Sequence, residues 1–210
     1  MTTFFLNRLA TEPHALAFAG QSTPWPVALA DQTTDPSLDE ALRGHIAAAN
    51  RLLTPVAADL LTTTGRPVDL FGFAPNPARL GAAADATASV EGVALTQLGA
   101  LLDLEHLGYS VAAAKPVAVL GHSQGVLAVH MARAIEAAGS IEAAGATLDE
   151  ILAVAALIGA AGTRRVRELG LNPKYGEASP MLSVKGATRE QVEALVKRVN
   201  NARGPISIAV

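Results

Sequence analysis

The segment GHSQG, residues 121–125, places a serine between two glycines directly after the apolar run PVAVL. That run predicts a strand of the kind buried in a parallel sheet, and the spacing of Val126–Ala138 predicts a helix, so Ser123 is expected in a sharp strand-to-helix turn. The glycines let the strand and the helix approach closely. The helix N-terminus and the backbone N–H of Gln124 favour developing negative charge. The pattern therefore predicts that Ser123 is a nucleophile for acyl groups, with a tight turn of purely structural role as the alternative.

A serine nucleophile needs a general base, most often a histidine. His130 lies seven residues further along, about 10 Å down the predicted helix and beyond hydrogen-bond reach of Ser123. His122 adjoins the serine, so its side chain is expected to leave the turn in another direction, as a packed turn residue or as a substrate contact. The other three histidines are expected in structural roles, and α/β-hydrolases place their histidine after the serine. All five precede residue 131: His14, His45, His106, His122 and His130.

The composition indicates a soluble globular protein. Half of the 210 residues are hydrophobic and 4% are aromatic, which predicts an aliphatic core large enough for one α/β domain. The sequence has no cysteine and no histidine pair at ligand-like spacing, so neither a disulfide nor a metal site is expected. The net charge of -3 does not predict a nucleic-acid-binding surface. With no apolar stretch of about 18 residues and no signal peptide, a cytoplasmic protein without a membrane partner is predicted.

Local patterns predict the elements that must position the serine. The apolar run His14–Gly20 predicts a strand and a following turn that holds Gln21. A mostly buried helix is predicted across Val93–Leu104, ending at Gly108. Three segments carry a hydroxyl three residues before a carboxylate or amide and so predict helix starts: Ser37–Glu40, Thr147–Glu150 and Thr188–Gln191. Further predictions are a helix end near Leu53, a helix over Pro55–Leu61 and a loop over Thr63–Ala88.

The pattern changes near residue 178. Met181–Val184 and Ile206–Val210 predict strands on either side of a helix, which together make half of a small α/β subdomain. The open edge of such a subdomain needs more chain to cover it. The sequence therefore predicts an α/β core over residues 1–178 and an incomplete subdomain over residues 179–210, with a truncated C-terminus.

Four segments, in this order and spacing, carry a resemblance to a known family: FAGQ at 18–21, SVEGVALTQLGALL at 89–102, GHSQGVLAV at 121–129 and LIGAAGT at 157–163. From about residue 14 onward the chain resembles the acyltransferase domain near the N-terminus of bacterial type I fatty acid synthases, in the malonyl/acetyl transferase superfamily. The resemblance implies an α/β fold: a hydrolase-like parallel-sheet core with a nucleophile elbow, and a ferredoxin-like subdomain inserted after it. Residues 179–210 would be the start of that subdomain.

The resemblance also implies ping-pong acyl transfer without a bound cofactor. Ser123 would attack the thioester of an acyl-CoA, and the phosphopantetheine thiol of an acyl carrier protein would collect the acyl group. The backbone N–H groups of Gln124 and Gln21 would form the oxyanion hole, Gln21 matching the glutamine of the family's GQG turn. Ser22 departs from that turn, where the family usually has a second glycine. The implied partners are acetyl-CoA, a carrier protein domain and the rest of the synthase polypeptide.

The same resemblance bears on acyl selectivity. Malonyl-selective relatives hold the substrate carboxylate with an arginine, and Gly159 aligns with that arginine here. A malonyl carboxylate buried without a cation would cost roughly several kcal/mol, so acetyl is favoured. Arg164 lies one or two turns further along with Arg165 and Arg167. It could reach a phosphate of CoA or phosphopantetheine, or the three could form a solvated helix end.

In the family the histidine base follows the serine beyond the ferredoxin-like insert, further along than residue 210. The resemblance therefore implies the priming acetyl transfer of fatty acid synthesis, with little turnover by this chain alone. Three alternatives stay open. They are a malonyl transferase, a serine esterase or thioesterase, which needs a downstream triad histidine, and a non-catalytic segment that serves in assembly.

Overall fold

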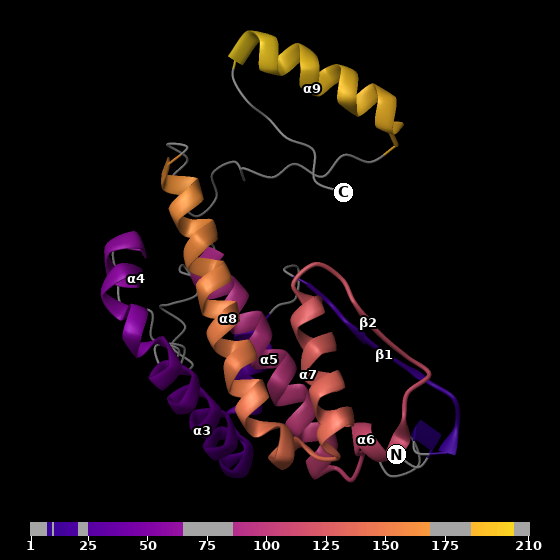
Figure 1. The fold of residues 1–210 in the computed structure, drawn as a ribbon. Coiled ribbons are helices and arrows are strands. Elements are labelled where there is room, and N and C mark those ends of the chain that lie inside the picture. The colour runs from indigo at the N-terminus through magenta and orange to yellow at the C-terminus, as the bar shows by residue number, and fades with distance from the viewer. Residues whose placement is uncertain (1–7, 10, 21–24, 65–85, 169–185, 204–210) are drawn as a thin grey trace. The chain divides into compact units, whose positions relative to one another are not determined.

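The computed structural model describes residues 8–9, 11–20, 25–64, 86–168 and 186–203, which fall into two compact units, Met1–Tyr175 and Gly176–Val210 (Figure 1). In the first unit the elements follow the order β1 (Ala15–Phe18), α2 (Trp25–Gln32), α3 (Pro36–Leu53), a short 3-10 helix (Thr54–Val56), α4 (Ala57–Thr64), α5 (Ala86–His106), α6 (Val111–Ala114), β2 (Ala118–Gly121), α7 (Gly125–Ala138) and α8 (Ile141–Glu168). The second unit contains α9 (Arg189–Arg203).

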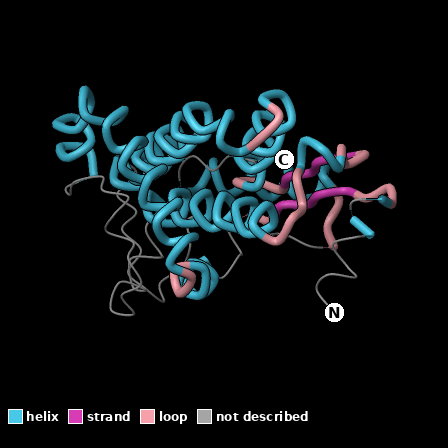
Figure 2. The backbone as a smooth tube through the Cα atoms, turned by 90° about the horizontal axis from the view of Figure 1, so that it is seen from below, coloured by secondary structure: helices cyan, strands magenta, loops and turns pink. Residues whose placement is uncertain are grey.

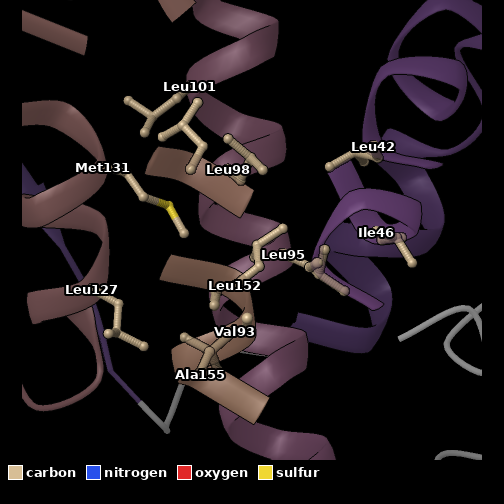
Figure 3. Packing of buried hydrophobic residues seen from close by; sticks show 14 of the residues in the cluster. Leu42, Ile46, Val93, Leu95, Leu98, Leu101, Leu127, Met131, Leu152 and Ala155 are labelled. Carbon is tan, nitrogen blue, oxygen red and sulfur yellow. The ribbon is translucent and has the colours of Figure 1, made fainter. Parts of the chain in front are cut away.

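The core of the first unit forms around α5, which contacts α2, α3, α7 and α8. Every residue from Ser89 to Gly99 is buried, so this helix is enclosed on all sides over three turns. Its leucines meet side chains from α3, α7 and α8 in one apolar cluster that includes Leu42, Leu95, Leu98, Leu101, Met131 and Leu152 (Figure 3). Full burial of each such side chain stabilises the fold by about 1.5–3 kcal/mol.

The two strands form a parallel pair, as short apolar strands in α/β proteins do (Figure 2). Leu16 lies opposite Val119, and Phe18 lies opposite Gly121. One face of the pair packs against the helical core through Leu16, Phe18 and Val119, whereas Leu120 on the other face is 58% exposed. The predicted strands are therefore confirmed, but the expected burial holds for one face only. Their place in a larger hydrolase-like sheet stays a prediction.

A hydrogen-bonded ring pair ties the start of β1 to the turn after α5. The Nδ1 of His14 is 2.9 Å from the carbonyl oxygen of Glu12, so in the neutral imidazole this nitrogen carries the proton and donates. Nε2 is then the acceptor, and the hydroxyl of Tyr109 donates to it at 2.6 Å. The two rings meet edge to face. Since the carbonyl of His14 also accepts from the N–H of Val117, this pair fixes the first residues of the sheet.

Tyr109→Phe is expected to destabilise the protein by about 1–2 kcal/mol at neutral pH, because a buried hydrogen bond to His14 is lost. Burial raises the pKa of the Tyr109 hydroxyl above its usual value. The wild type therefore keeps its full stability below pH about 10, where the unfolded phenol ionises, and loses some as the pH rises towards the folded-state pKa. Urea unfolding of both proteins between pH 7 and 11 should show the difference shrinking. A difference that stays constant would contradict this.

Helix α8 is the longest described element and runs beside α5 and α7, with α3 on its other side (Figure 1). The expectation of no apolar stretch of about 18 residues is wrong here, because Ile141–Arg165 is long and apolar enough to cross a membrane by length and composition alone. Leu148, Leu152, Ala155 and Ala156 on this stretch are fully or almost fully buried in the protein, as expected for a core helix. A partly buried pair, His45 Nδ1 to Asp149 Oδ1 at 2.6 Å, fastens α3 to it.

The helix starts show where local prediction held and where it was wrong. The box Thr188–Gln191 is confirmed, with reciprocal backbone-to-side-chain hydrogen bonds at the start of α9. The helix predicted from Ser37 to about Leu53 is confirmed as α3, but its predicted cap is wrong, because Asp35 caps the helix and Pro36 occupies its first turn. Hydrogen bonds from Ser37 and from the N–H of Leu38 hold the pKa of the Asp35 carboxyl below its usual range.

The helix start predicted at Thr147 is also wrong, because Thr147–Glu150 lies inside α8. The side chain of Ser140 accepts from the N–H of Ala143, so the helix is capped two turns earlier. Helices α2 and α6 were not predicted. The strands predicted at Met181–Val184 and Ile206–Val210 lie outside the described residues, and the ferredoxin-like subdomain stays a prediction.

Candidate active site

Ser123 occupies the turn between the end of β2 at Gly121 and the start of α7 at Gly125. Its φ of 54° is in the left-handed region, which among the described non-glycine residues only Lys115 shares. The N–H of Gly125 donates to the carbonyl of His122 at 2.9 Å, and the N–H of Val126 donates to that of Ser123 at 3.2 Å. A left-handed conformation costs a residue with a Cβ about 1–2 kcal/mol, and such strain gathers at functional sites. Ser123 is nevertheless exposed, so its hydroxyl is presented at the surface.

Two glycines make the close approach of the turn possible. A Cβ on Gly125 would collide with the carbonyl oxygen of Phe18 and lie 2.9 Å from that of Ala19, so only glycine lets α7 meet the end of β1. A Cβ on Gly20 would lie 2.6 Å from the carbonyl oxygen of His122 and 2.8 Å from the Cβ of Ser123. The end of β1, the serine turn and the start of α7 therefore touch backbone to backbone.

The N–H of Gln124 is placed to stabilise negative charge beside the serine. Gln124 is the N-cap of α7, and the described part of the chain offers its N–H no hydrogen-bond acceptor. That nitrogen lies 3.4 Å from the Cβ position of Gly20, so the segment leading to residue 21 runs beside it. Gln21 itself lies outside the described residues. The positive end of the α7 dipole adds to the donor.

Gly159 and Arg164 both lie on α8. Gly159 is buried, whereas Arg164 is exposed and its Nε is 3.6 Å from Glu168 Oε1. Arg165 pairs with the same carboxylate at 3.1 Å, and both arginine side chains are exposed. No interaction within the described ranges joins Gly159 or Arg164 to the serine turn, and their substrate roles stay predictions.

None of the five histidines forms a hydrogen bond with Ser123 within the described ranges. His14 is held by Tyr109, and His45 by Asp149. His122 and His130 are exposed. In the same part of the chain, no group of three or more His, Asp or Glu side chains is placed to hold a metal ion. The described part of the site is thus an exposed serine with one backbone donor beside it, the N–H of Gln124.

Gln97, which the sequence patterns did not predict as a site residue, reaches the edge of this site from α5. Its Nε2 donates to the carbonyl of Ala19 at 2.5 Å, one residue before Gly20. The signal that could have found it is a glutamine inside a helix whose neighbours are almost all apolar, because such a buried amide needs a specific partner.

Comparisons with known proteins give one result that bears on this geometry. The curated proteins and the solved structures yielded no match. A family described as "Starter unit:ACP transacylase in aflatoxin biosynthesis" matches residues 82–209, a stretch that runs from the start of α5 past the serine turn and through α9. The chain belongs to this family of starter unit:acyl carrier protein transacylases, which is an acyltransferase family.

Proposed function

We propose that the protein loads an acetyl starter unit from acetyl-CoA onto the phosphopantetheine thiol of an acyl carrier protein, as the priming step of a fatty acid synthase. The observation that carries this is the exposed Ser123, strained to a φ of 54° at the start of α7 beside the N–H of Gln124, which has no hydrogen-bond acceptor among the described residues. Strand, strained serine and helix follow one another as a nucleophile elbow requires. Family membership supports transfer to a carrier protein.

The chemistry proceeds in two balanced halves. The Oγ of Ser123 attacks the thioester carbonyl carbon while its proton passes to a general base. The oxyanion that forms accepts hydrogen bonds from the N–H of Gln124 and, by the resemblance, from that of Gln21. Collapse of this oxyanion breaks the carbon–sulfur bond. The CoA sulfur takes the proton from the base, and CoA leaves as a thiol. The carrier thiol then gives its proton to the base, attacks the acyl-serine ester and regenerates the Ser123 hydroxyl.

The base is proposed to be a group other than the five histidines of this chain. Within the described residues His14 is held by Tyr109 and His45 by Asp149, and His106, His122 and His130 make no hydrogen bond to Ser123. A serine hydroxyl without a base is a weak nucleophile near neutral pH. We therefore expect the 210-residue chain to form an acyl-serine slowly and to turn over little.

The preference for acetyl over malonyl follows from the residue aligned with the malonyl-binding arginine, Gly159. It is buried in α8 and brings no cation. A malonyl carboxylate there would be left without a partner, whereas an acetyl group needs none.

Intact-mass spectrometry after incubation with acetyl-CoA or malonyl-CoA tests this function. We expect a covalent adduct with acetyl-CoA, located on Ser123 by peptide mapping, and at least about tenfold less with malonyl-CoA, as the loss of a charge partner predicts. An adduct on another residue, or none after prolonged incubation, would overturn the serine assignment. Rapid release of free acetate would indicate a hydrolase instead.

A further inference from the structure

We propose that Gln97 is a positioning residue that fixes the backbone beside Ser123, an inference that rests on the acyl transfer proposed above. Gln97 lies on α5, 78 residues from Ala19 in sequence, and is 6% exposed. Its Nε2 donates to the Ala19 carbonyl at 2.5 Å. A side chain from the buried core helix thus reaches the last residues of β1.

Two successive carbonyls at the end of β1 are held by different parts of the protein. The carbonyl of Phe18 accepts from the N–H of His122, in the serine turn, at 3.0 Å. The next carbonyl, that of Ala19, accepts from Gln97. Because both carbonyls accept hydrogen bonds, the direction in which the backbone continues from Ala19 into Gly20 is fixed.

Gly20 couples the position of Ala19 to that of Ser123 because it contacts the serine turn directly. It is buried, and the place where its Cβ would be is 2.8 Å from the Cβ of Ser123 and 3.4 Å from the nitrogen of Gln124. No side chain fills the space between them. A shift of Ala19 therefore moves Gly20 directly against the nucleophile and the oxyanion donor.

The burial of Gln97 supports a geometric role over a stabilising one. Its Oε1 is buried and has no hydrogen-bond partner among the described residues, which is unfavourable for folding. Ala19 as a residue is exposed, and hydrogen bonding of its carbonyl by water after loss of the amide is part of the proposal. An apolar side chain would remove the unpaired oxygen at little cost, and what would be lost is the fixed direction of the chain at Gly20.

A matched control comes from Gln32, a partly buried amide that touches α5. Its Nε2 donates to the Thr96 carbonyl at 3.0 Å, and its Oε1 is also buried without a partner. Gln32→Leu therefore removes the same groups as Gln97→Leu, but from a contact between α2 and α5. We expect both variants to fold and to melt at similar temperatures.

The first measurement is the amide NMR spectrum, which does not depend on catalysis. Gln97→Leu is expected to shift or broaden the amide signals of Gly20, Ser123 and Gln124, and Gln32→Leu is expected to leave them in place. If the two variants perturb these three signals equally, or if neither does, Gln97 does not position the turn.

The second measurement is the acetylation of Ser123 by p-nitrophenyl acetate, followed by mass. Gln97→Leu is expected to lower the maximal acylation rate at least tenfold with an unchanged half-saturating concentration, and Gln32→Leu is expected to leave both unchanged. A wild-type rate in Gln97→Leu overturns the proposal. If wild-type Ser123 is not acetylated at all, the proposed function fails, and the NMR result alone decides the positioning role.

Gln97→Glu tests whether Gln97 acts through its hydrogen bond to the Ala19 carbonyl or only by filling space in the core. A carboxylate cannot donate to the Ala19 carbonyl, whereas a protonated carboxyl can. The acylation rate of this variant, divided by the wild-type rate at the same pH, should rise as the pH falls through the carboxyl pKa. A ratio that does not change with pH contradicts the proposal.

Discussion

A Ser123→Gly variant is expected to unfold at a higher urea concentration than the wild type and to form no acyl-enzyme. The φ of 54° is strained for serine and unstrained for glycine. Relief of this strain, less the larger backbone entropy that glycine loses on folding, leaves a gain of up to about 1 kcal/mol. The hydroxyl that attacks the thioester is gone, so the mass adduct with acetyl-CoA disappears.

The second left-handed residue among those described provides the control. Lys115 has a φ of 46° at the C-cap of α6. Lys115→Gly should stabilise the protein by a similar amount and keep the adduct. Ser123→Ala should lose the adduct without the gain in stability, because alanine keeps the strain. An acyl-enzyme that persists in either serine variant would show that another residue is the nucleophile.

Gly125→Ala is expected to lower the free energy of unfolding by about 3 kcal/mol, a large effect for one methyl group. The added Cβ would meet the carbonyl oxygens of Phe18 and Ala19. These are backbone atoms at the end of a paired strand, so they cannot move aside as the end of a flexible side chain can. The start of α7 must shift, and the serine turn with it, so acylation of Ser123 should fall as well.

Gly44→Ala separates this collision from the general effect of alanine in a helix. Gly44 lies in α3, and a Cβ there would meet nothing within 4 Å. This variant should be more stable by about 0.5–1 kcal/mol, from helix propensity alone. Urea denaturation of the two variants gives both numbers. Equal effects of the two substitutions would mean that α7 does not depend on the glycine contact.

The serine turn was predictable because each of its parts is local. The apolar run before residue 121, the two glycines and the helical spacing after Val126 are adjacent in the sequence, and the structure places Ser123 between β2 and α7 as expected. The capping box at Thr188 was predictable for the same reason, since its two partners are three residues apart. Patterns of this length encode turns and helix ends directly.

The parts that were missed depend on contacts between distant residues. Gln97 meets Ala19 across 78 positions, and His14 meets Tyr109 across 95. No local pattern pairs these residues. The wrong helix starts have a related cause, because each predicted box competes with another candidate cap nearby, Asp35 or Ser140. Helix propensity and packing then decided between candidates that look alike in sequence.

The nucleophile is held in place by main-chain atoms: the carbonyls of Phe18 and His122, and the close contacts at Gly20 and Gly125. Among the described contacts that place it, the amide of Gln97 on the Ala19 carbonyl is the side-chain contribution, so the other side chains around the turn can change without displacing it. In such a scaffold the reactivity of the hydroxyl and the choice of acyl group can evolve independently. Related chains could exchange one starter unit for another by substitutions on neighbouring helices while the serine stays where it is.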